Sequence, residues 1–247
     1  MKMKSAICAT LLLFAPGLVL ADEGPALLKA DVNLSDTASL QRGAKYFVNY
    51  CIGCHSLQYV RYNRLGEDLG LTDTQLETYL MPAGAKPSDT MMSAMPAADS
   101  EKWFGRTPPD LTLEARSRGT DWIYSYLKSF YVDPKSATGA NNTVLPNAAM
   151  PNVLWELQGL QKPVFTTVKN EDGSSYTVVD HFEQVTQGKL TPEQYDRVAM
   201  DLTNFLSYAA EPVQLERRDV GIDVIGFLIV FFLLTFMLKR EIWKKVH

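Results

Sequence analysis

The chain has 247 residues, of which 46% are hydrophobic and 21% are charged. This composition excludes a disordered chain, and three cysteines are too few for a small scaffold held together by disulfides. With 24 Lys and Arg against 28 Asp and Glu, the chain lacks the basic excess expected of a nucleic-acid-binding protein.

The segment from Met1 to Ala21 is predicted to be a secretory signal peptide. Lys2 and Lys4 give it a positive start, an apolar stretch follows, and small or branched residues occupy the −3 and −1 positions of a cleavage site. An uncleaved anchor is the alternative, but the apolar stretch is short and a proline–glycine pair interrupts it. Cleavage would leave Cys51 and Cys54 as the cysteines of an exported chain.

Residues 22–219 are predicted to form one exported domain. This segment carries 18 Lys and Arg and 26 Asp and Glu, an excess of eight negative charges. The predicted elements in chain order are a helix over Ser39–Tyr50, a helix capped by Thr72 and Gln75, a helix capped by Asp121 that runs through Phe130, a β-hairpin over Pro163–Asp180 with its turn at 170–173, and a helix from Pro192 to Ala209. Residues 81–109 and 133–151 are rich in Pro, Ala, Asn and Met and are predicted to be long ordered loops.

The last of these helices has the clearest sequence signal. Thr191 and Gln194 form a capping box, and Pro192 takes the first helical position. Apolar residues then follow at helical spacing until Glu211 and Pro212 end the pattern.

Residues 220–238 are predicted to form a transmembrane helix. They carry one charge, Asp223, and as a helix they would span about 28 Å, enough to cross a bilayer core. A buried core helix is the alternative, but apolar residues surround every face. The basic tail, residues 239–247, is predicted to lie in the cytoplasm, which places the large domain in the periplasm of a bacterial inner membrane.

The run from Cys51 to His55 has the C-x-x-C-H spacing by which c-type haem is attached. Its two thiols can reach the two vinyl groups on one porphyrin edge, and the adjacent imidazole can bind the iron as the proximal ligand. A thioredoxin-type motif is the alternative, but such a motif opens a helix, whereas this one follows a predicted helix. A zinc site would require a second pair of ligands.

A closed haem iron needs a sixth ligand from elsewhere in the chain. The candidates are Met81, Met91, Met92, Met95, Met150, Met200, Met237, His181 and His247. Met95 and Met150 share the sequence Ala-Met-Pro, and a position on a loop shortly before the last helix of the domain favours Met150. His181 is the main alternative, because two imidazoles can also hold haem iron.

Several further segments, before and after this motif in the chain, are informative together with it. They are Arg42-Gly43 with Tyr46, the run Cys51-Ile52-Gly53-Cys54-His55-Ser56-Leu57-Gln58-Tyr59-Val60, Pro108-Pro109-Asp110-Leu111-Thr112, Arg116-Ser117-Arg118-Gly119, Ala149-Met150-Pro151 and Ala209-Ala210-Glu211-Pro212. With these segments, from about Ser39 to the C-terminus, the sequence resembles the cytochrome c1 family, the haem subunit of the ubiquinol–cytochrome c reductase (bc1) complex.

The resemblance implies that Met150 is the axial ligand opposite His55. It also implies that Arg116 pairs with a haem propionate, a role that suits the two parallel donors of a guanidinium. Pro108 and Pro109 would stiffen the loop at the haem edge. Family members often have two prolines close after the axial methionine, whereas a single proline follows it here.

The sequence therefore predicts a mostly α fold: a c-type cytochrome haem domain enlarged by long loops and a small β-hairpin, plus one C-terminal transmembrane helix. With His55 and Met150 both bound, the haem iron would exchange single electrons and offer no open position to a substrate. The resemblance implies an electron carrier that receives electrons from a Rieske iron–sulfur protein and passes them to cytochrome c. Cytochrome b would be its main partner in the lipid bilayer.

Two other functions remain as alternatives. One is a free-standing membrane-anchored c-type cytochrome that feeds a terminal oxidase or reductase. The other is a haem peroxidase with one open axial site. The acidic excess of the exported domain further predicts electrostatic docking of a basic cytochrome c.

Overall fold

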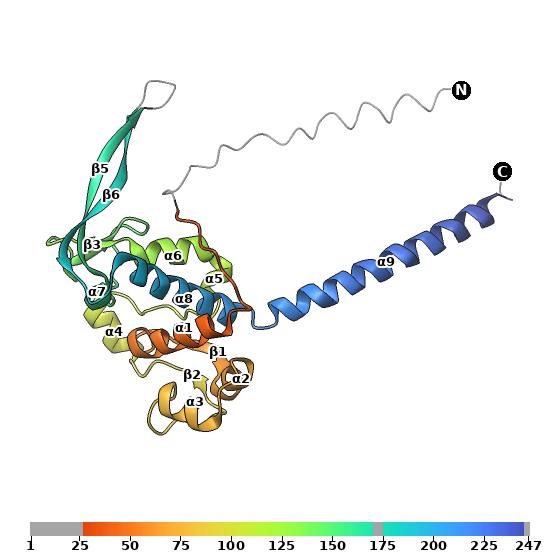
Figure 1. Cartoon of the computed structure of the whole chain (residues 1–247), viewed down its shortest axis with the longest axis horizontal. Coiled ribbons are helices and arrows are strands. Elements are labelled where there is room, and N and C mark those ends of the chain that lie inside the picture. Colours follow the sequence, from red (N-terminus) through yellow and green to blue (C-terminus); the bar gives the residue numbers. More distant parts are fainter. Residues whose placement is uncertain (1–26, 170–174, 245–247) are drawn as a thin grey trace.

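The computed structural model describes residues 27–169 and 175–244, so the predicted signal peptide lies outside the described residues. Helices predominate, and short antiparallel strand pairs lie between them (Figure 1). The helices are α1 (Thr37–Tyr50), α2 (Tyr62–Asp68), α3 (Asp73–Tyr79), α4 (Ala97–Phe104), α5 (Glu114–Ser117), α6 (Thr120–Lys128), α7 (Trp155–Gln158), α8 (Pro192–Ala210) and α9 (Gln214–Trp243). The strand pairs are β1 (Leu57–Arg61) with β2 (Thr90–Met91), β3 (Phe130–Val132) with β4 (Ala140–Asn142), and β5 (Gly159–Lys169) with β6 (Ser175–Gln187).

The two predicted capping boxes are confirmed. Thr72 and Gln75 cap α3, and Thr191 and Gln194 cap α8, with side chain and backbone bonded reciprocally in both cases. The predicted cap of α6 is wrong, because the N-cap of α6 is Gly119. The carboxylate of the expected cap residue, Asp121, instead accepts a hydrogen bond from the N–H of Ala30 at 2.7 Å.

The two stretches predicted to be loops contain short regular elements. Residues 81–109 include β2 and α4, and residues 133–151 include β4. Helix α4 follows Pro96 and ends at Gly105, whose φ of 72° is readily available to glycine. These elements are too short to produce a clear periodic pattern, and β2 is defined by a partner strand that is distant in sequence.

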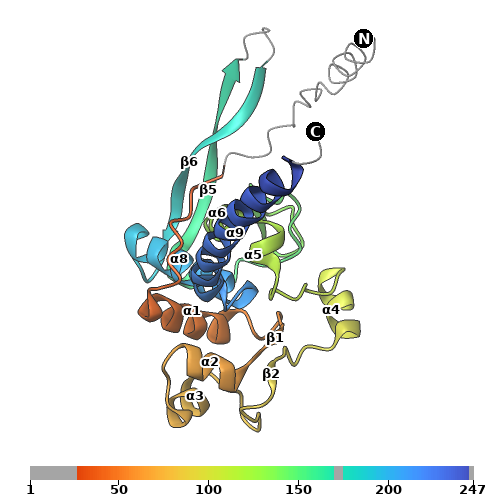
Figure 2. The ribbon, with the colours of Figure 1, turned by 90° about the vertical axis from the view of Figure 1, so that its right-hand side faces the viewer.

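Helices α1 and α8 pack closely together in the core, and α2 and α3 lie on the other side of α1 (Figures 1 and 2). A Cβ at Gly43 would overlap the backbone carbonyl oxygen of Asp201, so a glycine is needed for this close approach. The buried rings of Phe47 and Phe205 lie 5.7 Å apart. The Arg42 guanidinium donates two hydrogen bonds to the Asp201 carboxylate, at 2.7 and 2.8 Å. These contacts fix the position of α1, which leads into the C-x-x-C-H motif.

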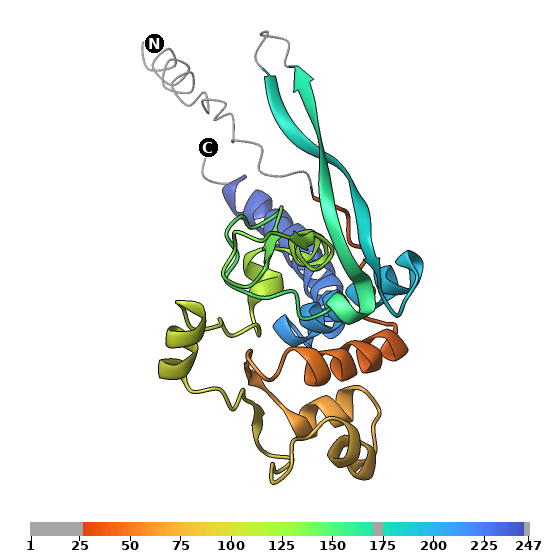
Figure 3. The same cartoon turned by 90° about the vertical axis from the view of Figure 1, so that its left-hand side faces the viewer.

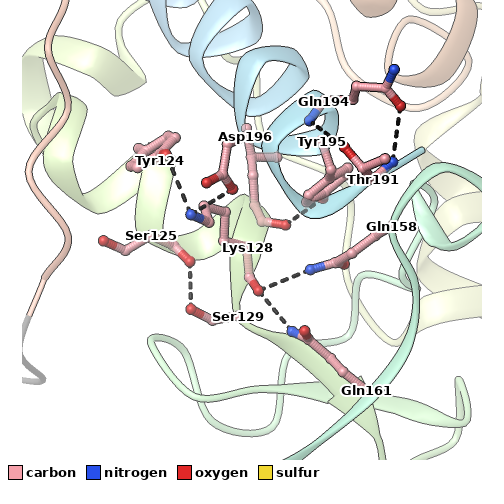
Figure 4. Close-up of polar contacts among 11 residues, drawn as sticks. Tyr124, Ser125, Lys128, Ser129, Gln158, Gln161, Thr191, Gln194, Tyr195 and Asp196 are labelled. Carbon is pink, nitrogen blue, oxygen red and sulfur yellow. Dashed lines mark hydrogen bonds and ion pairs between the residues drawn. The ribbon is translucent and has the colours of Figure 1, made fainter. Parts of the chain in front are cut away.

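The C-terminal end of α6 is tied to the start of α8 and to the base of β5 (Figure 4). Lys128 forms an ion pair with Asp196 at 2.6 Å, and the Tyr195 hydroxyl donates to the carbonyl oxygen of Leu127 at 2.7 Å. The side-chain amide of Gln161 donates to the carbonyl oxygen of Lys128 at 2.8 Å. The relative position of α6 and α8 is therefore set by hydrogen bonds as well as by apolar packing.

Strands β5 and β6 form a two-stranded ribbon that extends away from the helices (Figures 1 and 3). The register pairs Gly159 with Gln187 and Lys169 with Ser175. A hairpin is predicted here, but the observed strands are longer than Pro163–Asp180. The additional residues are rich in Gln, Glu and Lys, which have weak strand propensity, so the sequence pattern does not reveal them. The turn that the sequence predicts at 170–173 lies outside the described residues.

Helix α9 begins shortly after α8 and extends beyond the helical core (Figure 1). Its 30 residues correspond to about 45 Å, and its most apolar window has a mean hydropathy of 2.5. By length and composition α9 can cross a membrane. It exceeds the predicted span, 220–238, because the helical backbone continues into the polar residues on both sides.

Candidate functional site

The C-x-x-C-H motif forms the turn that closes α1. Cys51 is the C-cap residue of α1, and its N–H donates to the carbonyl oxygen of Phe47 at 2.8 Å. The N–H groups of Cys54 and His55 both donate to the carbonyl oxygen of Cys51, at 3.0 and 2.8 Å. The motif therefore folds into one tight turn, and the prediction that it follows the end of a helix is confirmed.

The two cysteines of the motif form no disulfide. Burial raises the pKa of Cys51 to about 12, and it also raises the pKa of Cys54. Dithiol motifs of the thioredoxin type instead have a thiol whose pKa is lowered, often by a helix N-terminus. The position of the motif at the C-terminal end of α1 disfavours the redox-dithiol alternative, and the direction of these pKa shifts agrees with it.

The His55 imidazole is held by a hydrogen bond at Nδ1, while Nε2 forms none with the residues that the structure describes. Its Nδ1 lies 2.8 Å from the carbonyl oxygen of Pro109, and because a carbonyl can only accept, Nδ1 carries the proton. Burial lowers the pKa of His55, an effect that the bond to Pro109 partly opposes. The imidazole is therefore neutral at pH 7, and its Nε2 lone pair is available to a metal. Metal-binding histidines are commonly oriented in this way by a carbonyl or carboxylate at the other ring nitrogen.

Two adjoining cavities lie beside the motif, with volumes of about 170 and 80 Å³. Both are lined by His55, Arg106, Pro109, Ala149 and Met150, so they are two parts of one cleft. We call it the motif cleft. Cys51 lines the larger part and Cys54 the smaller part.

The wall of the motif cleft is mostly apolar. Helix α6 contributes Trp122 and Tyr126, and α8 contributes Leu202 and Leu206. Pro108, predicted for the haem-edge loop, lines the smaller part. An apolar wall suits a flat hydrophobic ligand and excludes water from it.

The described residues that line the motif cleft include Met150 but neither Met95 nor His181. Met150 is half-buried, and its Sδ lies 3.5 Å from the Tyr126 hydroxyl. His181 lies on the exposed ribbon strand β6, where its Nδ1 is 2.8 Å from the Asp180 carboxylate. The position of Met150 on this wall supports it over the other two candidates.

The other sulfur candidates occupy different places in the fold. Met91 is fully buried in the core, and Met200 on α8 packs against the same core. Met81 also packs against the core, Met92 is exposed, and Met237 lies on α9. The last histidine of the chain, His247, lies outside the described residues.

Arginines also line the motif cleft. Among the described residues lining the motif cleft are Arg106 and Arg118, but not Arg116, which is exposed on α5. Arg118 donates to Glu114 at 2.8 Å, and its guanidinium lies 4.4 Å from the centre of the Trp122 ring. Sequence reasoning missed Arg106 because the residue belongs to a stretch that was predicted as a loop.

These observations fit a c-type haem. The cleft offers two adjacent thiols, a neutral imidazole with a free Nε2, an apolar wall and a thioether from a distant segment. The tertiary structure brings together Cys51, Cys54, His55 and Met150, of which the first three are adjacent in sequence and the fourth is not.

Comparison with known proteins identifies a family. A family model described as the Cytochrome C1 family matches residues 29–246. A protein named cytochrome c1 from Allochromatium vinosum is 50% identical over 246 residues, covering 99% of this chain and 100% of the relative. The mitochondrial cytochrome c1 heme protein of Saccharomyces cerevisiae is 27% identical, covering 85% of this chain and 68% of the relative.

Not every relative is named cytochrome c1. The ammonia monooxygenase gamma subunit of Nitrosomonas europaea is 41% identical, covering 89% of this chain and 88% of the relative.

Proposed function

The chain belongs to the cytochrome c1 family, and from this membership we propose which of its residues carry out electron transfer. Proteins of this family carry a covalently bound c-type haem and act as electron carriers in the bc1 complex. The chain is accordingly a haem-bearing electron-transfer subunit of ubiquinol–cytochrome c reductase.

The proposed haem site is the motif cleft. Cys51 and Cys54 would form the thioether bonds, while His55 and Met150 would be the two axial ligands. The haem supplies one-electron chemistry through its iron when bound. The carbonyl of Pro109 holds the His55 imidazole in the tautomer that a metal requires, at 2.8 Å. The observation that carries this assignment is the presence of Met150 and the free Nε2 of His55 on the wall of one apolar cleft.

The surrounding residues would control charge and solvent. Side chains of α6 and α8 exclude water from the cleft, which favours electron transfer over side reactions. A haem propionate would pair with an arginine. The resemblance implies Arg116 for this role, whereas the arginines among the described residues that line the cleft are Arg106 and Arg118.

With both axial positions taken by side chains, no position is left for a substrate at the iron. The proposal therefore gives this chain electron transfer and no substrate-activating site of its own, in contrast to a peroxidase. Methionine ligation also raises the potential relative to two histidines, which suits a carrier late in a quinol-oxidising chain.

We also propose the arrangement of the chain at the membrane. The signal peptide 1–21 would direct export, the domain 22–219 would lie in the periplasm, and residues 220–238 within α9 would cross the inner membrane. The tail 239–247 would remain in the cytoplasm. Electrons would arrive from a Rieske iron–sulfur protein and leave to cytochrome c, with cytochrome b beside α9.

Acid–acetone extraction of the purified chain tests the covalent site. Thioether bonds survive this treatment, so the haem should remain with the protein. Cys51→Ala should lose the acid-stable double attachment, whereas Cys8→Ala, in the predicted signal peptide, should retain it. Complete extraction of haem from the unaltered chain would refute covalent attachment.

Copurification in mild detergent tests the proposed partners. Cytochrome b and a Rieske protein should accompany the chain through affinity purification. Recovery of the chain alone would favour the free-standing cytochrome. Recovery with other subunits, as the name of the Nitrosomonas relative would suggest for that protein, would contradict the assignment to cytochrome b and the Rieske protein.

A further inference from the structure

The Tyr126 hydroxyl contacts the sulfur of Met150. The phenol oxygen lies 3.5 Å from Sδ, and the two residues come from segments 24 positions apart. A thioether has no proton to give, so the phenol is the donor and the sulfur the acceptor. Tyr126 also lines the larger part of the motif cleft.

The orientation of this phenol is fixed by aromatic neighbours. The Tyr126 ring stacks on Trp122 at a centroid distance of 4.9 Å and an angle of 10°. The ring of Phe130 meets it edge-on at 5.0 Å and 71°. The Arg118 guanidinium lies against Trp122, at 4.4 Å from its ring centre. The hydroxyl is therefore held at the cleft wall by a stack of planar groups.

Helix α6 at Tyr126 is also hydrogen-bonded to the segment that leads to Met150. The side-chain amide of Asn142, in β4, donates to the backbone carbonyl of Tyr126 at 2.8 Å. Asn142 is fully buried, and its side-chain Oδ1 accepts from the N–H of Val144 at 2.9 Å. The donor on α6 and the chain that leads to Met150 are therefore connected through one buried amide.

We propose that Tyr126 is a positioning residue for the axial thioether. Its hydrogen bond occupies one lone pair of Met150 Sδ and leaves the other for the iron. The bond also draws electron density from sulfur, which weakens donation to ferric iron more than to ferrous iron and so raises the haem potential. This inference rests on the proposed axial role of Met150.

The test compares Tyr126→Phe with Tyr124→Phe in the full-length, haem-loaded chain in detergent. Phenylalanine keeps the ring that stacks on Trp122 and removes the hydroxyl. Tyr124 lies on the same helix and is buried, but its hydroxyl contacts Lys128 at 3.3 Å instead of the cleft sulfur. It is therefore a matched control for the loss of a buried tyrosine hydroxyl.

Two measurements report on the state of the Met150 sulfur. They are the near-infrared sulfur-to-iron charge-transfer band of the oxidised protein and the midpoint potential of the haem. We expect Tyr126→Phe to shift or weaken the band. The ratio of reduced to oxidised haem at a fixed applied potential should fall by about two- to tenfold, as expected for the loss of one neutral hydrogen bond. Tyr124→Phe should leave both readouts unchanged.

If Tyr126→Phe and Tyr124→Phe have the same charge-transfer band and the same midpoint potential, the proposal is wrong and Tyr126 only contributes to packing. Met150→Leu separates this failure from a failure of the axial assignment. If Met150→Leu loses the band while Tyr126→Phe keeps it unaltered, the role of Tyr126 is wrong and the ligand is right. If Met150→Leu keeps the band, the ligand assignment itself is wrong.

Discussion

Single residues differ in how far the sequence alone could identify them. Cys51, Cys54 and His55 are recognisable because the chemistry of haem attachment fixes their spacing. The spacing leaves the choice between Met95 and Met150 open, since both stand in Ala-Met-Pro. Tyr126 could not be assigned, because its contact with Met150 depends on how α6 meets a distant loop. The sequence signal for Tyr126 was the presence of an aromatic residue at every fourth position from Trp122. This spacing more commonly reflects packing of one helix face.

The arginines at the cleft give a prediction at this scale. Replacing a cation next to a haem propionate should lower the potential, because the oxidised haem is then less disfavoured. We expect Arg106→Gln to lower it more than Arg116→Gln, since Arg106 lines both parts of the cleft. The loss of a hydrogen bond to a charged propionate should change the free energy of haem reduction by about 1.5–3 kcal/mol. Redox titration measures this, and a larger effect at Arg116 would favour the role that the resemblance implies.

Among the elements, the crossing of α1 and α8 supports the site most directly. Gly43→Ala would place a methyl group against the backbone of Asp201, so the helices would have to separate. We expect the free energy of unfolding to fall by about 1–3 kcal/mol, the usual cost of overpacking. Gly221→Ala on α9 is the control, because its Cβ meets no atom of the described residues within 4 Å. Equal stability of the two variants in denaturant titrations would show that this close approach is not needed.

Helix α9 is predicted to be a tether and not part of the haem domain. In the described part of the chain α9 has no buried residue, whereas α8 is buried along most of its length. A chain that stops after Arg218 should therefore be released as a soluble domain with covalent haem. Size-exclusion chromatography and the visible spectrum measure this. A truncated chain that cannot retain haem would show that α9 is required for the fold.

The elements that the sequence predicted well have local causes. The caps of α3 and α8 are set by residues three positions apart, and the close of α1 is set by its own motif. The elements that were missed have distant causes. Strand β2 exists because Thr90 and Met91 pair with β1, and Asp121 is drawn away from its expected capping role by the N-terminal segment at Ala30. Tertiary contacts determine the structure of these segments, and the local sequence pattern carries no information about those contacts.

For the whole molecule, the charge of the exported domain gives a kinetic prediction. Residues 22–219 carry eight more negative than positive charges, before haem propionates are counted. A basic cytochrome c should therefore associate faster at low salt, with screening over about 8 Å at physiological ionic strength. The second-order rate of electron transfer should fall steeply as salt rises. A flat or rising rate would indicate apolar docking, or a partner that is itself acidic or membrane-tethered.

The central claim is that His55 and Met150 close the iron of one covalent haem. Carbon monoxide binding to the reduced, full-length chain tests it most directly, with Met150→Leu compared against Met95→Leu. The unaltered chain and Met95→Leu should resist carbon monoxide, because both axial positions are filled. Met150→Leu should bind it and show a lower potential, because the thioether favours reduced iron. Binding to Met95→Leu but not to Met150→Leu, or ready binding to the unaltered chain, would contradict the account.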